Sequence, residues 1–244
     1  MMSSIKKVLG FVLPAMLSMA VLPVQSAELA ELGATGFSED GSYFAFEQYG
    51  TQDGSGYPYA SITIVDVVND SWVPGVPIAV RLENDSSTAN AARSATQQQA
   101  LGLLENYGIQ STNGVLLAHN PVSEISSDPK FVRFLPFKTT TAIGDPIEVT
   151  LNEFPLPAGD KCDIHGQTYG YRLLLSQPGK VRVLHEDTRI PKSRGCPLAY
   201  RIDQVIAYHV AGGDMVLAIM LVMNTPGFEG PDGKYLAVTT KIQR

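Results

Sequence analysis

Apolar and polar residues alternate without a break in the stretch Ile147-Glu148-Val149-Thr150-Leu151-Asn152. A period of two places successive side chains on opposite faces of a β-strand, so one face is expected to be buried and the other to contact water. The same pattern recurs in Ile78–Leu82 and in Phe131–Leu135. These stretches predict half-buried antiparallel strands.

Turn residues join such strands into hairpins. Gln177-Pro178-Gly179-Lys180 separates two β-type runs, and proline followed by glycine is typical of a type II turn. Ala211-Gly212-Gly213-Asp214 precedes the apolar run Met215–Met223, which has the length of a strand and is too short to span a bilayer. About eleven strand candidates result. The predicted fold is mainly β, with antiparallel sheets packed as a sandwich-like or an irregular propeller-like body.

One segment, near residues 87–107, has the composition of an α-helix, because it is rich in Ala, Gln and Leu and lacks proline. Ser87 or Thr88 can cap its start, and Gly108 can adopt the left-handed conformation that ends a helix. The first half is polar all round and is expected to fray. The helix is expected to pack by its last two turns, through an apolar stripe of Ala100, Leu101, Leu104 and Tyr107.

The N-terminus has the three parts of a secretory leader. Lys6 and Lys7 precede the largely apolar run Val8–Val24, and small residues that include Ala27 follow it. Signal peptidase requires this order of charged flank, short apolar core and small-residue exit. A membrane anchor needs roughly 20 apolar residues, whereas this run is shorter and contains a proline. We therefore predict a signal peptide over residues 1–27 and a secreted, mainly β domain over residues 28–244, periplasmic or extracellular, with a subdivision near 108–130 as an alternative.

The charge balance restricts the partners. The chain carries 18 basic and 24 acidic residues, a net charge of −6, and the leader removes two lysines and no acidic residue. Nucleic acids and anionic membrane surfaces bind basic proteins, so the balance argues against both. No membrane span is predicted after the leader, because no later apolar run is long enough. The predicted partner is an unknown protein or a small-molecule ligand, and no cofactor is predicted.

Cys162 and Cys196 are the two cysteines of the chain. In an oxidising compartment, one such pair predicts a disulfide. A metal site is the alternative, because zinc accepts cysteine and histidine ligands. Its ligands would come from Cys162, His165, His185, Cys196 and His209. Their irregular gaps favour the disulfide and no metal.

A local pattern occurs twice. Phe37-Ser38-Glu39-Asp40-Gly41-Ser42-Tyr43-Phe44-Ala45-Phe46 is followed at a distance by Ile62–Val67, and Pro231-Asp232-Gly233-Lys234-Tyr235-Leu236-Ala237-Val238 repeats its first half. This pattern resembles a blade hairpin of the Tol-B type β-propellers. The resemblance implies a propeller-like arrangement in which the last strand lies near the first. Two ordinary Asp-Gly turns that each lead into a strand are the alternative.

A second resemblance spans essentially the whole chain after the leader. It rests on Gly36-Phe37-Ser38, Tyr43–Glu47, Gln52–Gly56, Asp70–Gly75, Glu153–Pro157, Arg189–Pro197 and Pro226–Asp232, which occur in this order. Together these segments resemble a bacterial family of predicted secreted proteins of unknown function. The resemblance implies export and a bacterial source. The family has no assigned activity, so it implies no catalytic residue.

Two clusters are candidate binding residues. The first is basic and surrounds Cys196; it consists of Arg189, Lys192, Arg194 and Arg201. Arginines can bind a carboxylate or phosphate through two parallel hydrogen bonds, although pairing with Glu186, Asp187 and Asp203 is the alternative. The second lies in a glycine-rich loop and consists of Tyr49, Tyr57 and Tyr59. These rings could form a lip for a sugar, peptide or aromatic ligand, or they could simply pack on the sheet.

Motifs of the common enzyme classes are not found in the sequence. It has no G-x-S-x-G, H-E-x-x-H or phosphate-binding loop. The sequence therefore favours a non-enzymatic exported binding or interaction module of the bacterial envelope. One alternative is a hydrolase of envelope carbohydrate or peptide that uses Glu47 and Asp66 as a carboxylate pair. The other is a metal-handling protein that binds through Cys162, His165 and Cys196.

Overall fold

The computed structural model of the chain describes residues 27–84, 86–110 and 114–243. The predicted signal peptide lies outside the described residues except for Ala27. Within the described ranges the chain forms three antiparallel β-sheets, one α-helix and two short 3-10 helices. The mainly β class and the single α-helix are confirmed.

The first sheet, here called the N-terminal sheet, has the order β4-β3-β2-β1-β6, with β5 also paired to β3. Its strands are β1 (Glu31–Ser38), β2 (Tyr43–Thr51), β3 (Pro58–Asp66), β4 (Ser71–Trp72), β5 (Ile78–Arg81) and β6 (Ile109–Gln110). The central sheet has the order β14-β13-β12-β7. Its strands are β7 (Val115–His119), β12 (Ala199–His209), β13 (Met215–Pro226) and β14 (Pro231–Ile242).

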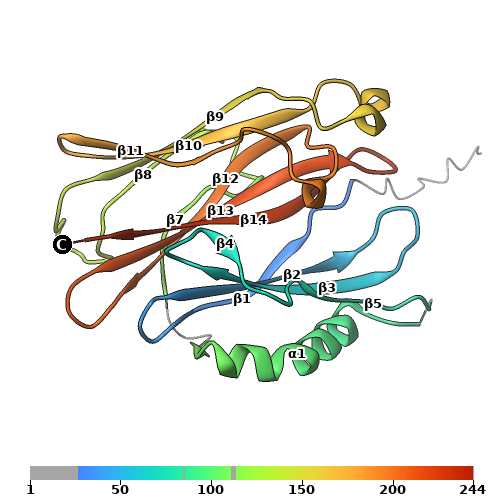
Figure 1. The fold of residues 1–244 in the computed structure, drawn as a ribbon, viewed down its shortest axis with the longest axis horizontal. Coiled ribbons are helices and arrows are strands. Elements are labelled where there is room, and N and C mark those ends of the chain that lie inside the picture. Colours follow the sequence, from blue (N-terminus) through green and yellow to red (C-terminus); the bar gives the residue numbers. More distant parts are fainter. Residues whose placement is uncertain (1–26, 85, 111–113, 244) are drawn as a thin grey trace, which may run out of the picture.

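The third sheet, here called the β8–β11 sheet, has the order β11-β10-β9-β8. Its strands are β8 (Phe131–Phe134), β9 (Ile147–Pro155), β10 (Tyr169–Gln177) and β11 (Lys180–Glu186). Figure 1 shows the sheets and α1 (Ala89–Asn106) as stacked layers, with the central sheet between the other two and α1 below the N-terminal sheet. This face-to-face stacking corresponds to the sandwich-like form of the prediction rather than to blades around an axis.

Strand β13 explains why the run Met215–Met223 has no polar face. All nine residues of this run are buried. Leu217, Ile219 and their alternate neighbours pack against the β8–β11 sheet, whereas Val216, Ala218 and theirs pack against the N-terminal sheet. A strand covered on both faces needs apolar side chains at every position, so the apolar run encodes the three-sheet stack.

The helix starts and ends as its sequence predicts. Thr88 caps the N-terminus by accepting a hydrogen bond from the amide of Ala91, and Gly108 has a φ of 60°. The predicted packing by the last two turns is confirmed for Ala100, which is fully buried, and for Leu104 and Tyr107, which pack against a core cluster of the N-terminal sheet, but Leu101 is 56% exposed. The first half packs as well, because Ala92 and Thr96 are fully buried. Small residues let the whole helix approach β3, and the Thr96 hydroxyl lies 3.2 Å from the carbonyl oxygen of Ala60.

Both predicted hairpin turns are confirmed, since β10 pairs with β11 around Gly179 and β12 pairs with β13 around the loop 210–214. Asp40-Gly41 also forms a turn, with Gly41 at a φ of 70°. The second Asp-Gly pair does not, because Asp232 and Gly233 lie inside β14. Gly233 lies close to residue 29: a Cβ atom at this position would lie 2.5 Å from Leu29 Cδ1.

Candidate functional site

A small polar cleft lies where the three sheets meet. Its volume is about 170 Å³. The N-terminal sheet contributes its β3–β4 turn, the β8–β11 sheet contributes β10 and β11, the central sheet contributes β14, and the 3-10 helix Lys192–Arg194 closes one side. The lining residues are Val65, Asp70, Trp72, Tyr171, His185, Pro191, Ser193, Arg194, Leu236 and Ala237. We call this site the three-sheet cleft.

His185 connects two carboxylates in this cleft. Its Nε2 lies 2.9 Å from Asp187 Oδ1, and its Nδ1 lies 3.8 Å from Asp70 Oδ2. Its ring stacks on Tyr171 with the ring centroids 4.6 Å apart. Burial alone would lower the pKa of His185, but the contacts with the Asp187 and Asp70 carboxylates outweigh it and raise that pKa above its usual value. The cleft therefore favours the imidazolium form.

Asp187 is the buried acceptor of the network. Its side chain is 3% exposed, and its Oδ2 accepts hydrogen bonds from the Tyr171 amide at 3.0 Å and from Arg194 Nη1 at 2.7 Å. Burial would raise the pKa of Asp187, but the hydrogen bonds from His185 and the Tyr171 amide and the charge of Arg194 together lower it. A buried carboxylate with three donors remains ionised and fixes the positions of its partners.

Arg194 enters the cleft from the disulfide-bonded loop. Its guanidinium lies over the Tyr171 ring, 4.9 Å from the centroid, and its Nη2 lies 3.3 Å from His185 Nε2. Only 11% of its side chain is exposed. Arg194 ends the short 3-10 helix, and Gly195 after it has a φ of 61°. A guanidinium has five N–H donors; Nη1 donates to Asp187, and Nη2 makes a long hydrogen bond of 3.5 Å to the Tyr171 hydroxyl.

Asp70 is held in an unusual backbone conformation. It is the one non-glycine residue with positive φ, 45°, that the described ranges contain. Its Oδ1 accepts hydrogen bonds from the amide of Thr239 at 2.7 Å and from the Thr239 hydroxyl at 3.1 Å, which binds the β3–β4 turn to β14. Asp tolerates the left-handed region better than most residues, and such strain is concentrated at functional sites.

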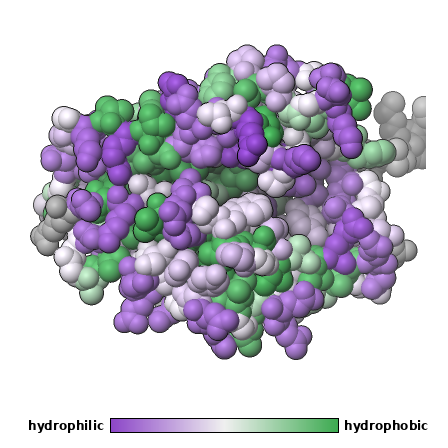
Figure 2. Space-filling model, in the orientation of Figure 1, coloured by the Kyte–Doolittle hydropathy of each residue, from purple (hydrophilic) through white to green (hydrophobic). Residues whose placement is uncertain are grey.

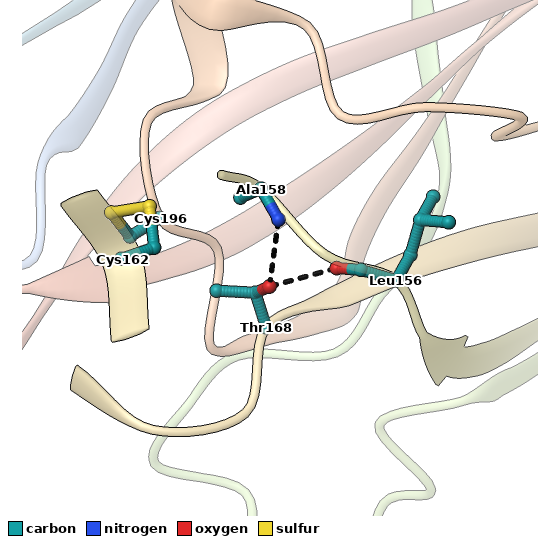
Figure 3. Close-up of a disulfide and its surroundings, with 5 residues drawn as sticks. All are labelled: Leu156, Ala158, Cys162, Thr168 and Cys196. Atoms are coloured by element: carbon teal, nitrogen blue, oxygen red, sulfur yellow. Dashed lines mark hydrogen bonds between the residues drawn. A yellow bond between two sulfur atoms is a disulfide. The ribbon is translucent and has the colours of Figure 1, made fainter. Parts of the chain in front are cut away.

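The predicted disulfide is confirmed. Cys162 and Cys196 are bonded, with Cα atoms 5.4 Å apart. Figure 3 shows the bond beside Thr168, whose hydroxyl donates to the carbonyl of Leu156 at 2.7 Å and accepts from the amide of Ala158 at 3.2 Å. The bond joins the loop before β10 to the loop that carries Arg194. It also consumes both sulfur ligands of the metal alternative, and the described residues contain no group of three suitable metal ligands.

The four basic candidates do not form one site. Arg189 and Lys192 are exposed, and only Arg194 enters the cleft. Arg201 lies elsewhere, on β12, where its Nη2 donates to the carbonyl of Asn120 at 2.8 Å. The predicted alternative, pairing with nearby acidic residues, holds for Arg194 with Asp187.

The three tyrosines also lie apart. Tyr49 is on β2, where its hydroxyl donates to Glu31 Oε2 at 2.7 Å, and the guanidinium of Arg93 from α1 lies over its ring. Tyr59 packs on the other face of the N-terminal sheet, against the core shared with the central sheet. Burial, and to a smaller extent contact with Glu28, raises the pKa of Tyr59. Tyr57 is the last residue of the loop between β2 and β3. These rings form no common lip.

The carboxylate pair of the hydrolase alternative is not assembled. In the β2–β3 register Glu47 faces Ile62, and Asp66 faces Tyr43, four positions away. Glu47 is buried beneath α1, where Arg93 Nη2 donates to its Oε2 at 2.8 Å. Asp66 instead caps its own turn through the amides of Val68 and Asn69.

Sequence reasoning missed most of the cleft. Asp70, Trp72 and Tyr171 were not candidates, and His185 was considered only as a metal ligand. The one local signal is the spacing of His185 and Asp187 at the end of a strand, followed seven residues later by Arg194. The contribution of Asp70 depends on the sheet stacking and has no local signal.

The exterior has a mixed character. Figure 2 shows polar residues over most of one face, with apolar residues in separate groups. In the described part of the chain, none of the helices is long and apolar enough to cross a membrane.

Comparison with known protein families places this chain beside a family. A family model described as "Predicted secreted protein (DUF2259)" matches residues 45–241. A search of curated proteins finds no match. The matched region includes every residue that lines the three-sheet cleft.

Proposed function

Because this chain belongs to the DUF2259 family of predicted secreted proteins, we propose that it is an exported, non-enzymatic binding module of the bacterial envelope. Residues 1–27 act as the signal peptide in this proposal, and the protein works in the periplasm or outside the cell. The three-sheet cleft is its binding site. The ligand is a small molecule that carries both a positive and a negative group.

One observation carries the proposal: Asp70 and Arg194 place opposite charges on the lining of one cleft, and Trp72 lines it beside them. Arg194 suits a carboxylate or phosphate, whereas Asp70 suits an ammonium group. Trp72 is 44% exposed and offers an apolar surface to the ligand body. The Asp187 hydrogen bonds hold Arg194 and His185 in place before the ligand arrives, which lowers the entropy cost of binding.

The single tryptophan of the chain makes a direct binding test available. Trp72 fluorescence would be followed while amino acids and dipeptides are added to the protein. A saturable change in fluorescence is expected for at least one of these probes. The absence of a saturable change with every probe would contradict the proposed ligand class.

Two variants locate the response. Arg194→Lys keeps the positive charge but loses the planar fork, so the affinity should fall about tenfold or more, as expected for a lost bidentate contact. Arg189→Ala removes an exposed charge from the same loop and should leave the affinity unchanged. Equal affinities for Arg194→Lys and the unsubstituted protein would exclude the cleft as the site.

A further inference from the structure

We propose that removal of the leader at the Ala27–Glu28 bond creates a structural ion pair between the new α-ammonium group of Glu28 and the carboxylate of Asp232. The signal peptide is part of the proposed function, and the inference rests on it. The ion pair itself concerns the folded, processed protein and does not depend on ligand binding.

The backbone of Glu28 is already fixed beside Asp232. The Glu28 nitrogen lies 3.2 Å from Asp232 Oδ1. Its carbonyl accepts a hydrogen bond from the amide of Gly233 at 2.7 Å, and the amide of Ala30 donates to the carbonyl of Gly233 at 2.9 Å. Leu29 forms a parallel bridge with Gly233. The chain therefore joins the start of β14 from its first residue after the predicted cut.

Gly233 packs closely against the Leu29 side chain. A Cβ atom there would lie 2.5 Å from Leu29 Cδ1 and 3.1 Å from Val222 Cγ1. Leu29 Cα would lie 3.7 Å away, which is ordinary van der Waals contact, so a larger residue would displace the exposed Leu29 side chain rather than the backbone of residues 28–30.

The surroundings favour a positive charge at this position. Glu28 Oε2 accepts a hydrogen bond from the amide of Asp53 at 3.2 Å, and Asp232 is adjacent. Burial, with a smaller contribution from Asp232, raises the pKa of Glu28. Lys234 and Arg81 are the basic residues of the adjoining pocket, which also contains these three acidic residues. An additional cation would therefore relieve repulsion among the carboxylates.

Cleavage changes the chemistry of one nitrogen. A leader-cleaving peptidase uses water to break the C–N bond between Ala27 and Glu28. The water oxygen becomes part of the Ala27 carboxylate, which leaves with the leader. The Glu28 nitrogen gains protons and becomes an ammonium group, whose pKa is ordinarily about 7.7–8.0, so it is charged at neutral pH. The existing hydrogen bond from the uncharged backbone amide to the Asp232 carboxylate thereby becomes an ion pair between two opposite charges, which is stronger.

A double-mutant cycle tests the pair. The chain would be prepared with its free amino group on Glu28 and, separately, with Ala27 retained, so that the charge is displaced by one residue. Each form would be made with Asp232 and with Asp232→Asn. The form that begins at Glu28 should have a Tm about 2–4 °C higher than the form that begins at Ala27, a shift typical of one ion pair in a protein of this size. Asp232→Asn should abolish that difference, whereas the exposed control Asp145→Asn should preserve it.

Equal Tm values for the two forms, or a difference that persists in Asp232→Asn, would overturn the ion pair. The mass of the protein recovered from the host envelope tests the cut separately. A chain that begins at Glu28 is expected, and any other first residue would overturn the assigned cut. Fluorescence binding at Trp72 reports on neither outcome, so failure of the ion pair and failure of the proposed function remain distinguishable.

Discussion

Two buried carboxylates of this protein each bind an arginine whose guanidinium lies over a tyrosine ring. Glu47 binds Arg93, which covers Tyr49, and Asp187 binds Arg194, which covers Tyr171. The carboxylate side chains are 1% and 3% exposed. The same chemical unit thus occurs once beneath α1 and once in the three-sheet cleft.

The surroundings of the two pairs differ. Arg93 comes from α1 and Gln97 donates to the same Glu47 carboxylate at 3.1 Å, so this pair fastens the helix to the N-terminal sheet. The cleft pair has His185 and Asp70 in addition, and its arginine comes from a loop. An arginine–carboxylate pair therefore serves as a helix anchor where a helix covers it, and we propose that it serves as a preorganised recognition element where a cleft remains open.

The largest expected effect is that of Asp187→Ala. It would leave the Arg194 guanidinium and the His185 imidazole without their shared buried acceptor. Breaking a buried charge network in this way typically costs 3–5 kcal/mol, so the free energy of unfolding should fall by about 4 kcal/mol. Urea unfolding at neutral pH measures this change.

Asp163→Ala is the matched control for that prediction. Asp163 is exposed on the 3-10 helix that carries Cys162, and its loss should change the free energy of unfolding by less than about 0.5 kcal/mol. Equal losses for the two variants would mean that the cleft network adds nothing beyond an ordinary surface charge.

A smaller effect is expected from Arg93→Met, which keeps the apolar stem and removes the charge. The side chain of Arg93 is 27% exposed, so water can partly replace it at Glu47. The free energy of unfolding should fall by about 2 kcal/mol, in the range for hydrogen bonds to charged groups. Hydrogen exchange should accelerate in α1 and stay unchanged in β10 and β11. Faster exchange in both regions would show that the two pairs are not independent.

The sequence predicts those structural features that depend on residues close together in the chain. The alternation of Ile147–Asn152, the cap at Thr88, the turn at Gly179 and the pairing of Arg194 with Asp187 all involve short separations. Glu47 and Arg93 are 46 positions apart, and no local pattern connects them. The apparent carboxylate pair of Glu47 and Asp66 was wrong because strand register, which the sequence does not state, separates them.

The predicted subdivision near 108–130 also depends on contacts between residues far apart in the sequence. Strand β7 comes from this segment and pairs with β12 in the central sheet. Because that sheet is covered on both faces, we propose that residues 28–244 form a single domain. The continuous apolar run in β13 was recognised as a strand, but its second buried face became interpretable only once both covering sheets were known.

The smallest expected effect is a pH dependence that only the cleft pair should have. Histidine has an ordinary pKa of about 6.5 in the unfolded chain, and the folded cleft raises the pKa of His185. The folded state then binds the proton more tightly than the unfolded state. The resulting stabilisation is fully present below about pH 6.5 and is lost as the pH rises through the folded-state pKa. The lowered pKa of Asp187 acts in the opposite direction, because its stabilisation is lost only as the pH falls through the acidic range.

His185→Gln isolates this contribution, since glutamine retains hydrogen-bonding groups but does not titrate. The free energy of unfolding of the unsubstituted protein should decline from about pH 6.5 upward more steeply than that of the variant. His165→Gln, which removes an exposed histidine, should follow the unsubstituted protein. Urea unfolding across this pH range supplies the curves. Parallel curves for His185→Gln and the unsubstituted protein would mean that the imidazole contributes no proton-linked stability. The cleft pair and the helix anchor would then not differ in proton-linked stability. Arg194 would be the better residue to substitute when locating a ligand.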